Sequence, residues 1–261
     1  MYPHHRRAIE RLRDRFEPDP ENLALLIIGS VGRADAHERS DLDCVLVVTG
    51  GAYQRREAEG SLSIAAHDVC EYPDGEANIG AVQLQFLRAA AERGPEPVRF
   101  AYTGTIVVFS RIPSLEELLA QIPCYPEHER TRKLISFASQ LPVHVSYMHL
   151  AEYSRSPYLL AQCAVEIVLF GGRLILAHNR MLYPSRKLFL RELERAPDRP
   201  TDLLDLATHL LEHPGINSAK AFCDRVLSFA DWPRPPEGHM ARFQHDRELQ
   251  WLSGTPALAD S

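Results

Sequence analysis

The most informative part of the chain is LLIIGSVGRADAHERSDLDCVLVV, residues 25–48. Its first apolar run ends at Gly29 and Ser30, which is typical of a buried strand that stops at a tight turn. Ten mostly polar residues without a strand pattern follow, and a second apolar run begins around Asp41 and Asp43. The stretch therefore predicts two buried strands joined by a polar connection.

The two aspartates carry the chemistry of this stretch. Side chains alternate along a strand, so Asp41 and Asp43 are expected on the same side, a few ångströms apart. Two bare carboxylates that close repel each other unless a cation neutralises them. Mg²⁺ is the natural cation, because it takes oxygen ligands and usually binds one or two carboxylates together with substrate phosphates. The pair therefore predicts a magnesium site.

Phosphate binding is predicted beside this pair. Gly29 allows the backbone to approach a ligand closely. Ser30 and the amides that follow it, at an expected helix N-terminus, can donate hydrogen bonds to phosphate oxygens. Arg33 adds a positive charge that suits a β- or γ-phosphate. These residues together favour a nucleoside triphosphate as ligand.

The same residues carry a family resemblance. The order strand, Gly29-Ser30, about ten residues and then Ser40-Asp41-Leu42-Asp43 on a second strand resembles the nucleotidyltransferase superfamily, which includes DNA polymerase β and the antibiotic nucleotidyltransferases. The resemblance implies a mixed sheet flanked by helices, and transfer of a nucleoside monophosphate from a triphosphate. It also implies a third carboxylate on a neighbouring strand, which would complete a two-metal site.

Two acids compete for this third position. Asp68 and Glu71 lie in IAAHDVCEY and are three residues apart, so on a strand they face opposite sides and only one can join the pair. We favour Asp68, because Glu71 lies close to the turn-forming Pro73-Asp74-Gly75. If neither reaches the metals, the resemblance implies a nucleotide-binding relative without transferase activity.

Periodicity divides the chain into an α+β half and a helical half. Apolar patterns predict a surface helix at His5–Phe16 and strands at Leu23–Ile28, Leu42–Val48, Ile64–Tyr72 and Thr105–Phe109, with Val82–Leu87 as a hairpin strand or a helix start. A helix start follows Pro113-Ser114, the pattern is helical from Arg130 onward, and Gly171-Gly172 predicts a kink or a break. A tail with three prolines precedes a short expected helix at residues 242–252. We predict a nucleotidyltransferase domain at residues 1–112 and a helical bundle domain at 113–261.

The helical half carries a weaker resemblance to bacterial nucleotidyltransferases that have a C-terminal bundle. An Asn-Arg pair, an aromatic-Pro step and a Lys recur in those proteins in this order, and here they are Asn179-Arg180, Tyr183-Pro184 and Lys187. The resemblance implies that Lys187 balances triphosphate charge. It also implies a glutamate as general base, for which Glu166 is favoured and Glu152 is the other candidate.

Composition sets the class of partner. The chain has 261 residues, 35 acidic and 29 basic side chains and a net charge of −6, which disfavours a nucleic-acid acceptor. Its five cysteines are odd in number and lack CxxC spacing, which suits a reducing cytosol. No signal-peptide pattern and no apolar run of membrane-spanning length is recognisable. We expect a cytoplasmic protein without a membrane partner.

The expected reaction is Mg²⁺-dependent transfer of a nucleoside monophosphate, from ATP in the first instance, to a hydroxyl of a small molecule. The acidic net charge suits a cationic acceptor such as an aminoglycoside antibiotic. A protein acceptor, as in AMPylating members of the superfamily, is also compatible with it. The alternative class is a nucleotide-binding regulatory or antitoxin-type protein, weakly active or inactive. Both a monomer and a homodimer remain open.

Overall fold

The computed structural model describes residues 1–252 and 254 and divides into two compact units, residues 1–124 and 125–261. The predicted boundary at residue 112 is therefore placed too early. Helix α6 (Leu115–Gln121) belongs to the N-terminal unit, because Leu115 and Leu119 are buried in a core that also contains sheet residues. The helix pattern marked where helices begin, but it could not tell which core they join.

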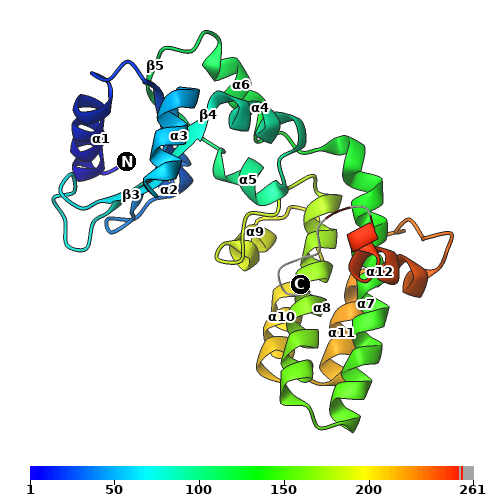
Figure 1. Cartoon of the computed structure of the whole chain (residues 1–261). Helices are drawn as coiled ribbons and strands as arrows, with labels where there is room; N and C mark the ends of the chain where they lie inside the picture. The colour runs from blue at the N-terminus through cyan, green and yellow to red at the C-terminus, as the bar shows by residue number, and fades with distance from the viewer. Residues whose placement is uncertain (253, 255–261) are drawn as a thin grey trace. The chain divides into compact units, whose positions relative to one another are not determined.

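A five-stranded mixed sheet forms the centre of the N-terminal unit (Figure 1). Its strands are β1 (Asn22–Ile28), β2 (Leu42–Val48), β3 (Ser63–Ala66), β4 (Ala77–Gln83) and β5 (Ile106–Ser110), in the spatial order β3-β4-β2-β1-β5. The pair β2 and β4 is parallel, and the other neighbours are antiparallel. The predicted α+β class is confirmed.

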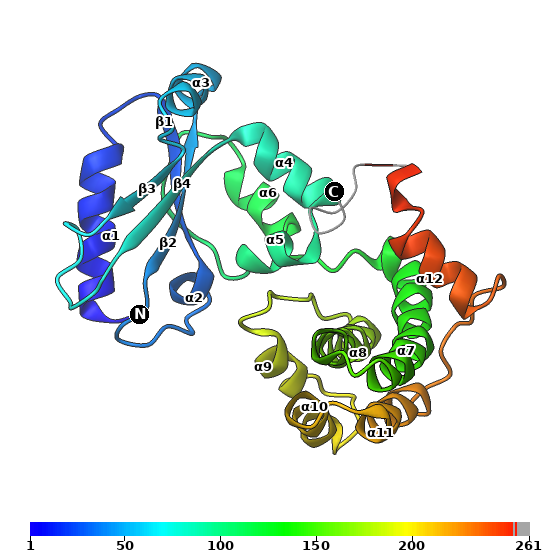
Figure 2. The ribbon, with the colours of Figure 1, turned by 60° about the horizontal axis from the view of Figure 1, so that its bottom comes forward.

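Helices cover both faces of this sheet (Figure 2). On one face, α1 (Pro3–Phe16) packs its apolar side on β1 and β2, together with the start of α3 (Gly50–Ala58). On the other face, α4 (Leu84–Arg93), α5 (Glu96–Ala101) and α6 share a second core with β1 and β2. The two central strands are thus apolar on both sides, which explains their continuous apolar runs.

Two strand predictions differ from the structure. The expected strand at residues 64–72 ends at Ala66, because the polar residues that follow turn back toward α1 and form ion pairs with it. The segment 82–87 spans the junction of β4 and α4, and β4 begins five residues earlier, at Ala77. Its sequence, ANIGAVQ, contains Asn and Gly, which are poor strand formers.

The C-terminal unit is helical, as predicted. It contains α7 (Arg130–Tyr153), α8 (Pro157–His178), α9 (Phe189–Glu194), α10 (Leu203–Glu212), α11 (Ile216–Leu227) and α12 (His239–Arg247), with short 3₁₀ turns at Glu127–Glu129 and Gln250–Leu252. Helix α7 is continuous over 24 residues, with Pro142 inside it.

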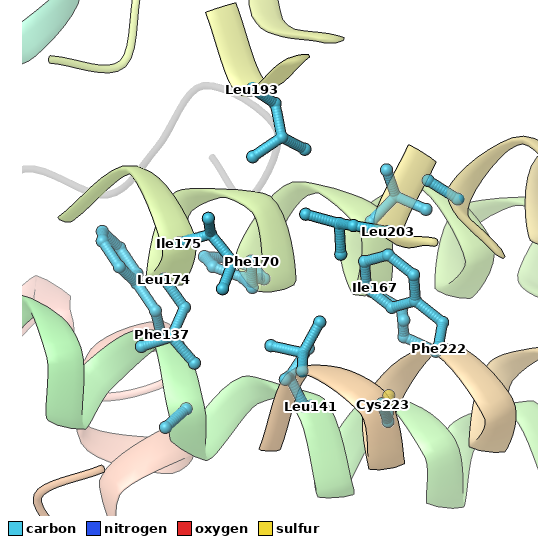
Figure 3. Packing of buried hydrophobic residues seen from close by; sticks show 14 of the residues in the cluster. Phe137, Leu141, Ile167, Phe170, Leu174, Ile175, Leu193, Leu203, Phe222 and Cys223 are labelled. Carbon is cyan, nitrogen blue, oxygen red and sulfur yellow. The ribbon is translucent and has the colours of Figure 1, made fainter. Parts of the chain in front are cut away.

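Helix α8 runs through Gly171 and Gly172 without a break. The reason for these glycines is packing: an added β-carbon would lie 2.9 Å from Phe222 Cζ at Gly171 and 3.0 Å from Phe189 Cε2 at Gly172. Two aromatic rings therefore lie directly on the helix backbone. Figure 3 shows Phe222 among the buried side chains of this core, near Ile167 of α8.

Among the described residues, α8 is the one helix long and apolar enough to cross a membrane by length and composition. Its residues Ile167, Leu174 and Ile175 are fully buried in the C-terminal core. The core of the bundle thus accounts for the apolar character of α8.

Candidate functional site

Gly29 and Asp43 meet at the end of the first two strands. Strands β1 and β2 are antiparallel, with Ile28 opposite Asp43, so the chain leaves β1 beside the carboxylate. Gly29 has a φ of +67°, and a β-carbon added there would lie 3.0 Å from Asp43 Cγ and closer still to Oδ2. Only glycine combines this conformation with this approach. The structure thus gives Gly29 a close approach to Asp43, and its approach to a ligand stays a prediction.

Ser30 and Arg33 follow directly. Ser30 lies in α2 (Gly29–Gly32), a single helical turn that connects β1 to the polar segment. The Arg33 guanidinium carbon lies 4.9 Å from the centre of the Phe100 ring, which belongs to α5. This stacking holds the Arg33 guanidinium on the face of the sheet that α5 covers.

The loop before Asp41 is fixed through Ser40. The Ser40 carbonyl oxygen accepts hydrogen bonds from Tyr72 Oη at 2.8 Å and from His5 Nε2 at 3.0 Å, which assigns the ring proton to Nε2. Its hydroxyl oxygen accepts from the His37 backbone N–H at 2.9 Å. Burial lowers the pKa of His5, which favours this neutral donor. Asp41 itself is exposed, one residue before β2.

His5 and Tyr72 are positioning residues that the sequence did not reveal. They come from α1 and from the loop after β3, 35 and 32 residues away from Ser40 along the chain. No local pattern marks a contact of this kind. In the sequence, His5 only looked like part of a surface helix.

The expectation that Asp68 completes the site is not met. Asp68 lies beyond the end of β3, is 69% exposed, and forms an ion pair with Arg15 of α1 that lowers its pKa. Strand β4 also separates β3 from β2. The physical reason for the error is strand order: the strand that follows in sequence is not the neighbour in space.

Glu71, the second candidate, is bound to the same helix. It pairs with Arg7, Nε to Oε2, at 2.8 Å and with Arg11, and these two contacts lower its pKa. Both acids therefore anchor the loop after β3 to α1.

On the side of β2 away from β1, the neighbouring strand is β4, which presents Asn78 next to Asp43. The two residues are direct partners in the parallel register, and both are exposed. Neighbouring strands lie about 5 Å apart, so their side chains are adjacent on the same face of the sheet. The sequence did not reveal Asn78, because Asn78 is not an acid and because β4 has no strong strand pattern.

The polar side chains at the start of β2 and β4 fit one divalent cation. Asp41 and Asp43 offer carboxylate oxygens and Asn78 an amide oxygen, which are ligands that Mg²⁺ accepts. In the described part of the chain, no group of three His, Cys, Asp or Glu side chains is placed to hold a metal. The Asp43 carboxylate occupies the position that a β-carbon at Gly29 would take, so this ligand is in direct contact with the backbone at the start of α2.

The remaining predicted residues belong to the C-terminal unit. Glu166 of α8 is 17% exposed, and its Oε1 lies 3.0 Å from Arg247 Nη2, whereas Lys187 is exposed between α8 and α9. Glu152 Oε1 accepts from the Ile216 backbone N–H at 2.8 Å and so caps the start of α11. Asn179 binds the Asp198 backbone, both N–H and carbonyl. The functional roles of Glu166 and Lys187 stay predictions.

Part of the N-terminal unit is similar in sequence to a known protein family. Residues 3–72 match the sequence model of a family described as "Putative nucleotidyltransferase DUF294". A crystal structure of a nucleotidyltransferase-like protein from Exiguobacterium sibiricum 255-15 is similar at 14% identity and a TM-score of 0.46, over 85% of this chain and 73% of that chain. No curated protein matches the chain. The N-terminal unit has a nucleotidyltransferase-type fold.

Proposed function

We propose that the protein binds a nucleoside triphosphate with Mg²⁺ at Gly29, Ser30, Asp41 and Asp43, and transfers the nucleoside monophosphate to a hydroxyl group. The observation that carries this proposal is the contact between Gly29 and the Asp43 carboxylate at the junction of β1 and β2. Because Gly29 has no side chain, the backbone that would donate to a phosphate lies beside the carboxylate that would hold its cation.

Each residue has a part in this proposal. Asp41 and Asp43 hold the cation, which when bound offsets the negative charge of the triphosphate. Ser30 donates to a phosphate oxygen, and Arg33, stacked on Phe100, adds positive charge nearby. His5 and Tyr72 keep Asp41 in place through the Ser40 carbonyl.

The bonds that change are those of a phosphoryl substitution. A bond forms between the acceptor oxygen and the α-phosphorus, the bond from the α-phosphorus to the bridging oxygen breaks, and pyrophosphate leaves. The acceptor hydroxyl gives up its proton to a base, and Glu166 is proposed for this step. Lys187 is proposed to balance triphosphate charge.

The proposed substrate is ATP, and the proposed acceptor is a small molecule, with cationic antibiotics first because the chain carries a net charge of −6. The same charge argues against a nucleic-acid acceptor. We place the protein in the cytoplasm, without a membrane partner, as a monomer or a homodimer.

The test is transfer from ATP labelled at the α-phosphate, with Mg²⁺ and a panel of hydroxyl acceptors. The proposal expects labelled acceptor and an equal amount of pyrophosphate, both lost in Asp41→Asn and Asp43→Asn. Asp68→Asn is the matched control, since this acid pairs with Arg15 and should leave transfer unchanged. Tight ATP binding without pyrophosphate release, for every acceptor, would favour the regulatory or antitoxin-type alternative.

A further inference from the structure

We infer that the site takes a single divalent cation with its nucleotide, because Asn78 stands beside Asp43 where a second cation would need a carboxylate. The inference rests on the proposed function and adds the metal content of that same site. It departs from the two-metal site that the family resemblance implied.

The sheet leaves few positions from which another acid could approach. On the face that carries Asp43, β4 presents Asn78, Gly80 and Val82, and none of them is acidic. On the other side of β2, Ile28 of β1 is the partner of Asp43. Both strands that flank Asp43 therefore place neutral side chains next to it.

Three acids near the end of the sheet lie close to other side chains. Asp68 and Glu71 pair with arginines of α1. Glu76, one residue before β4, has its Oε1 3.9 Å from His67 Nε2. Across the described residues, no third His, Cys, Asp or Glu gathers with Asp41 and Asp43 in a group that could hold a metal.

The negative charge of the protein ligands is enough for one divalent cation but not for two. Two carboxylates match the charge of one Mg²⁺, and the amide oxygen of Asn78 adds a ligand without adding negative charge. A second cation would stand close to the first with no further carboxylate to separate them, and like charges that close repel strongly. The nucleotide phosphates alone would have to offset it.

A single cation has a consequence for the reaction. In two-metal sites one cation serves the attacking oxygen and the other the leaving oxygen. With one cation at the triphosphate, deprotonation of the acceptor hydroxyl depends on a protein base alone. We therefore expect slow transfer in the natural chain, and faster transfer when an acid replaces Asn78.

The experiment counts Mn²⁺ bound to the full chain at saturating non-hydrolysable ATP analogue, by equilibrium dialysis with electron paramagnetic resonance detection. The natural chain is expected to bind one Mn²⁺ per nucleotide, and Asn78→Asp two. Asn78→Ser is the matched neutral control and should keep one. Glu76→Gln should also keep one, because Glu76 is not a ligand in this proposal.

The outcomes separate this inference from the proposed function. Two Mn²⁺ per nucleotide in the natural chain, or an unchanged count of one in a folded Asn78→Asp, would overturn the inference while nucleotide binding stands. Absence of analogue binding with any cation would overturn the proposed function itself. Thermal unfolding of each variant shows whether it is folded, and the count for the natural chain decides the claim even if Asn78→Asp does not fold.

Discussion

Gly29 is the residue on which the proposed site depends most. Replacing it with Ala puts a methyl group against Asp43 and imposes a φ of +67° on a residue that disfavours it. We expect Gly29→Ala to weaken binding of Mg²⁺ and ATP analogue at least about tenfold, or about 1.4 kcal/mol. Isothermal titration calorimetry measures this change.

Gly60 supplies the matched control for that substitution. It has nearly the same φ, +68°, but an added β-carbon there meets no atom within 4 Å. Gly60→Ala therefore carries the backbone strain without the contact, and it should lower stability by about 1 kcal/mol and leave nucleotide affinity unchanged. Equal losses of affinity in both variants would show that strain, and not the contact with Asp43, is responsible.

His144 makes the C-terminal unit sensitive to acid. It is buried against Phe170 and Phe243, and burial, followed by the charge of Arg247, lowers its pKa to about 4 from an ordinary 6.5. Because the folded pKa is the lower one, protonation favours the unfolded state, so stability falls as the pH drops below 6.5. The fall should reach about 2 kcal/mol at roughly pH 5.

Urea unfolding of the C-terminal unit at neutral pH and at about pH 5 measures this effect. His144→Gln should remove about 2 kcal/mol of the difference between the two conditions. His149→Gln, on an exposed part of the same helix, should not. An unchanged acid sensitivity in His144→Gln would mean that other groups cause it.

At the scale of elements, Arg99 of α5 ties three helices of the N-terminal unit together. It is 4% exposed and donates to four carbonyl oxygens: Ala91 at 2.9 Å, Gly94 at 2.8 Å, Ile122 at 3.1 Å and Cys124 at 3.3 Å. These carbonyls lie in or just after α4 and after α6. The guanidinium thus satisfies backbone groups at two helix ends.

Arg99→Lys should destabilise the N-terminal unit by about 2–4 kcal/mol. An ammonium on a flexible stem cannot reach four carbonyls with the planar fork of Arg, and buried acceptors are then left unpaired. The free energy of unfolding in urea measures the loss. Arg88→Lys, exposed on α4, is the control, and a loss of similar size there would argue against the carbonyl contacts as the cause.

The sequence was informative about elements with strong local patterns. The runs at residues 23–28 and 42–48 predicted β1 and β2, and the long amphipathic stretches predicted the helices of the C-terminal unit. Strand β4 was missed because its residues are weak strand formers that gain stability from the parallel pairing with β2. Pairing between strands that lie far apart in the sequence leaves no pattern in the residues of either strand.

The site shows the same division between local and long-range information. The placement of Gly29, Ser30, Asp41 and Asp43 at the ends of β1 and β2 follows from their spacing along the chain, so this placement could be predicted. Asn78 depends on strand order, and the supports His5 and Tyr72 depend on how α1 and the loop after β3 pack. The error over Asp68 has this origin, since it treated neighbours in sequence as neighbours in the sheet.

For the whole molecule, the acidic net charge of −6 bears on which partners the protein binds. Two of the acids, Asp41 and Asp43, lie at the start of β2, where the proposed cation would offset their charge. An acidic chain can therefore bind a polyanionic triphosphate through that cation. Binding should be strong with Mg²⁺ and weak without it.

Cation-dependent nucleotide binding at Asp43 can be measured as the affinity of the full chain for a non-hydrolysable ATP analogue, with Mg²⁺ and with a chelator. We expect one nucleotide per chain with Mg²⁺, and at least about a tenfold loss of affinity with chelator or in Asp43→Asn. Affinity that is the same in Asp43→Asn and independent of Mg²⁺ would contradict this expectation.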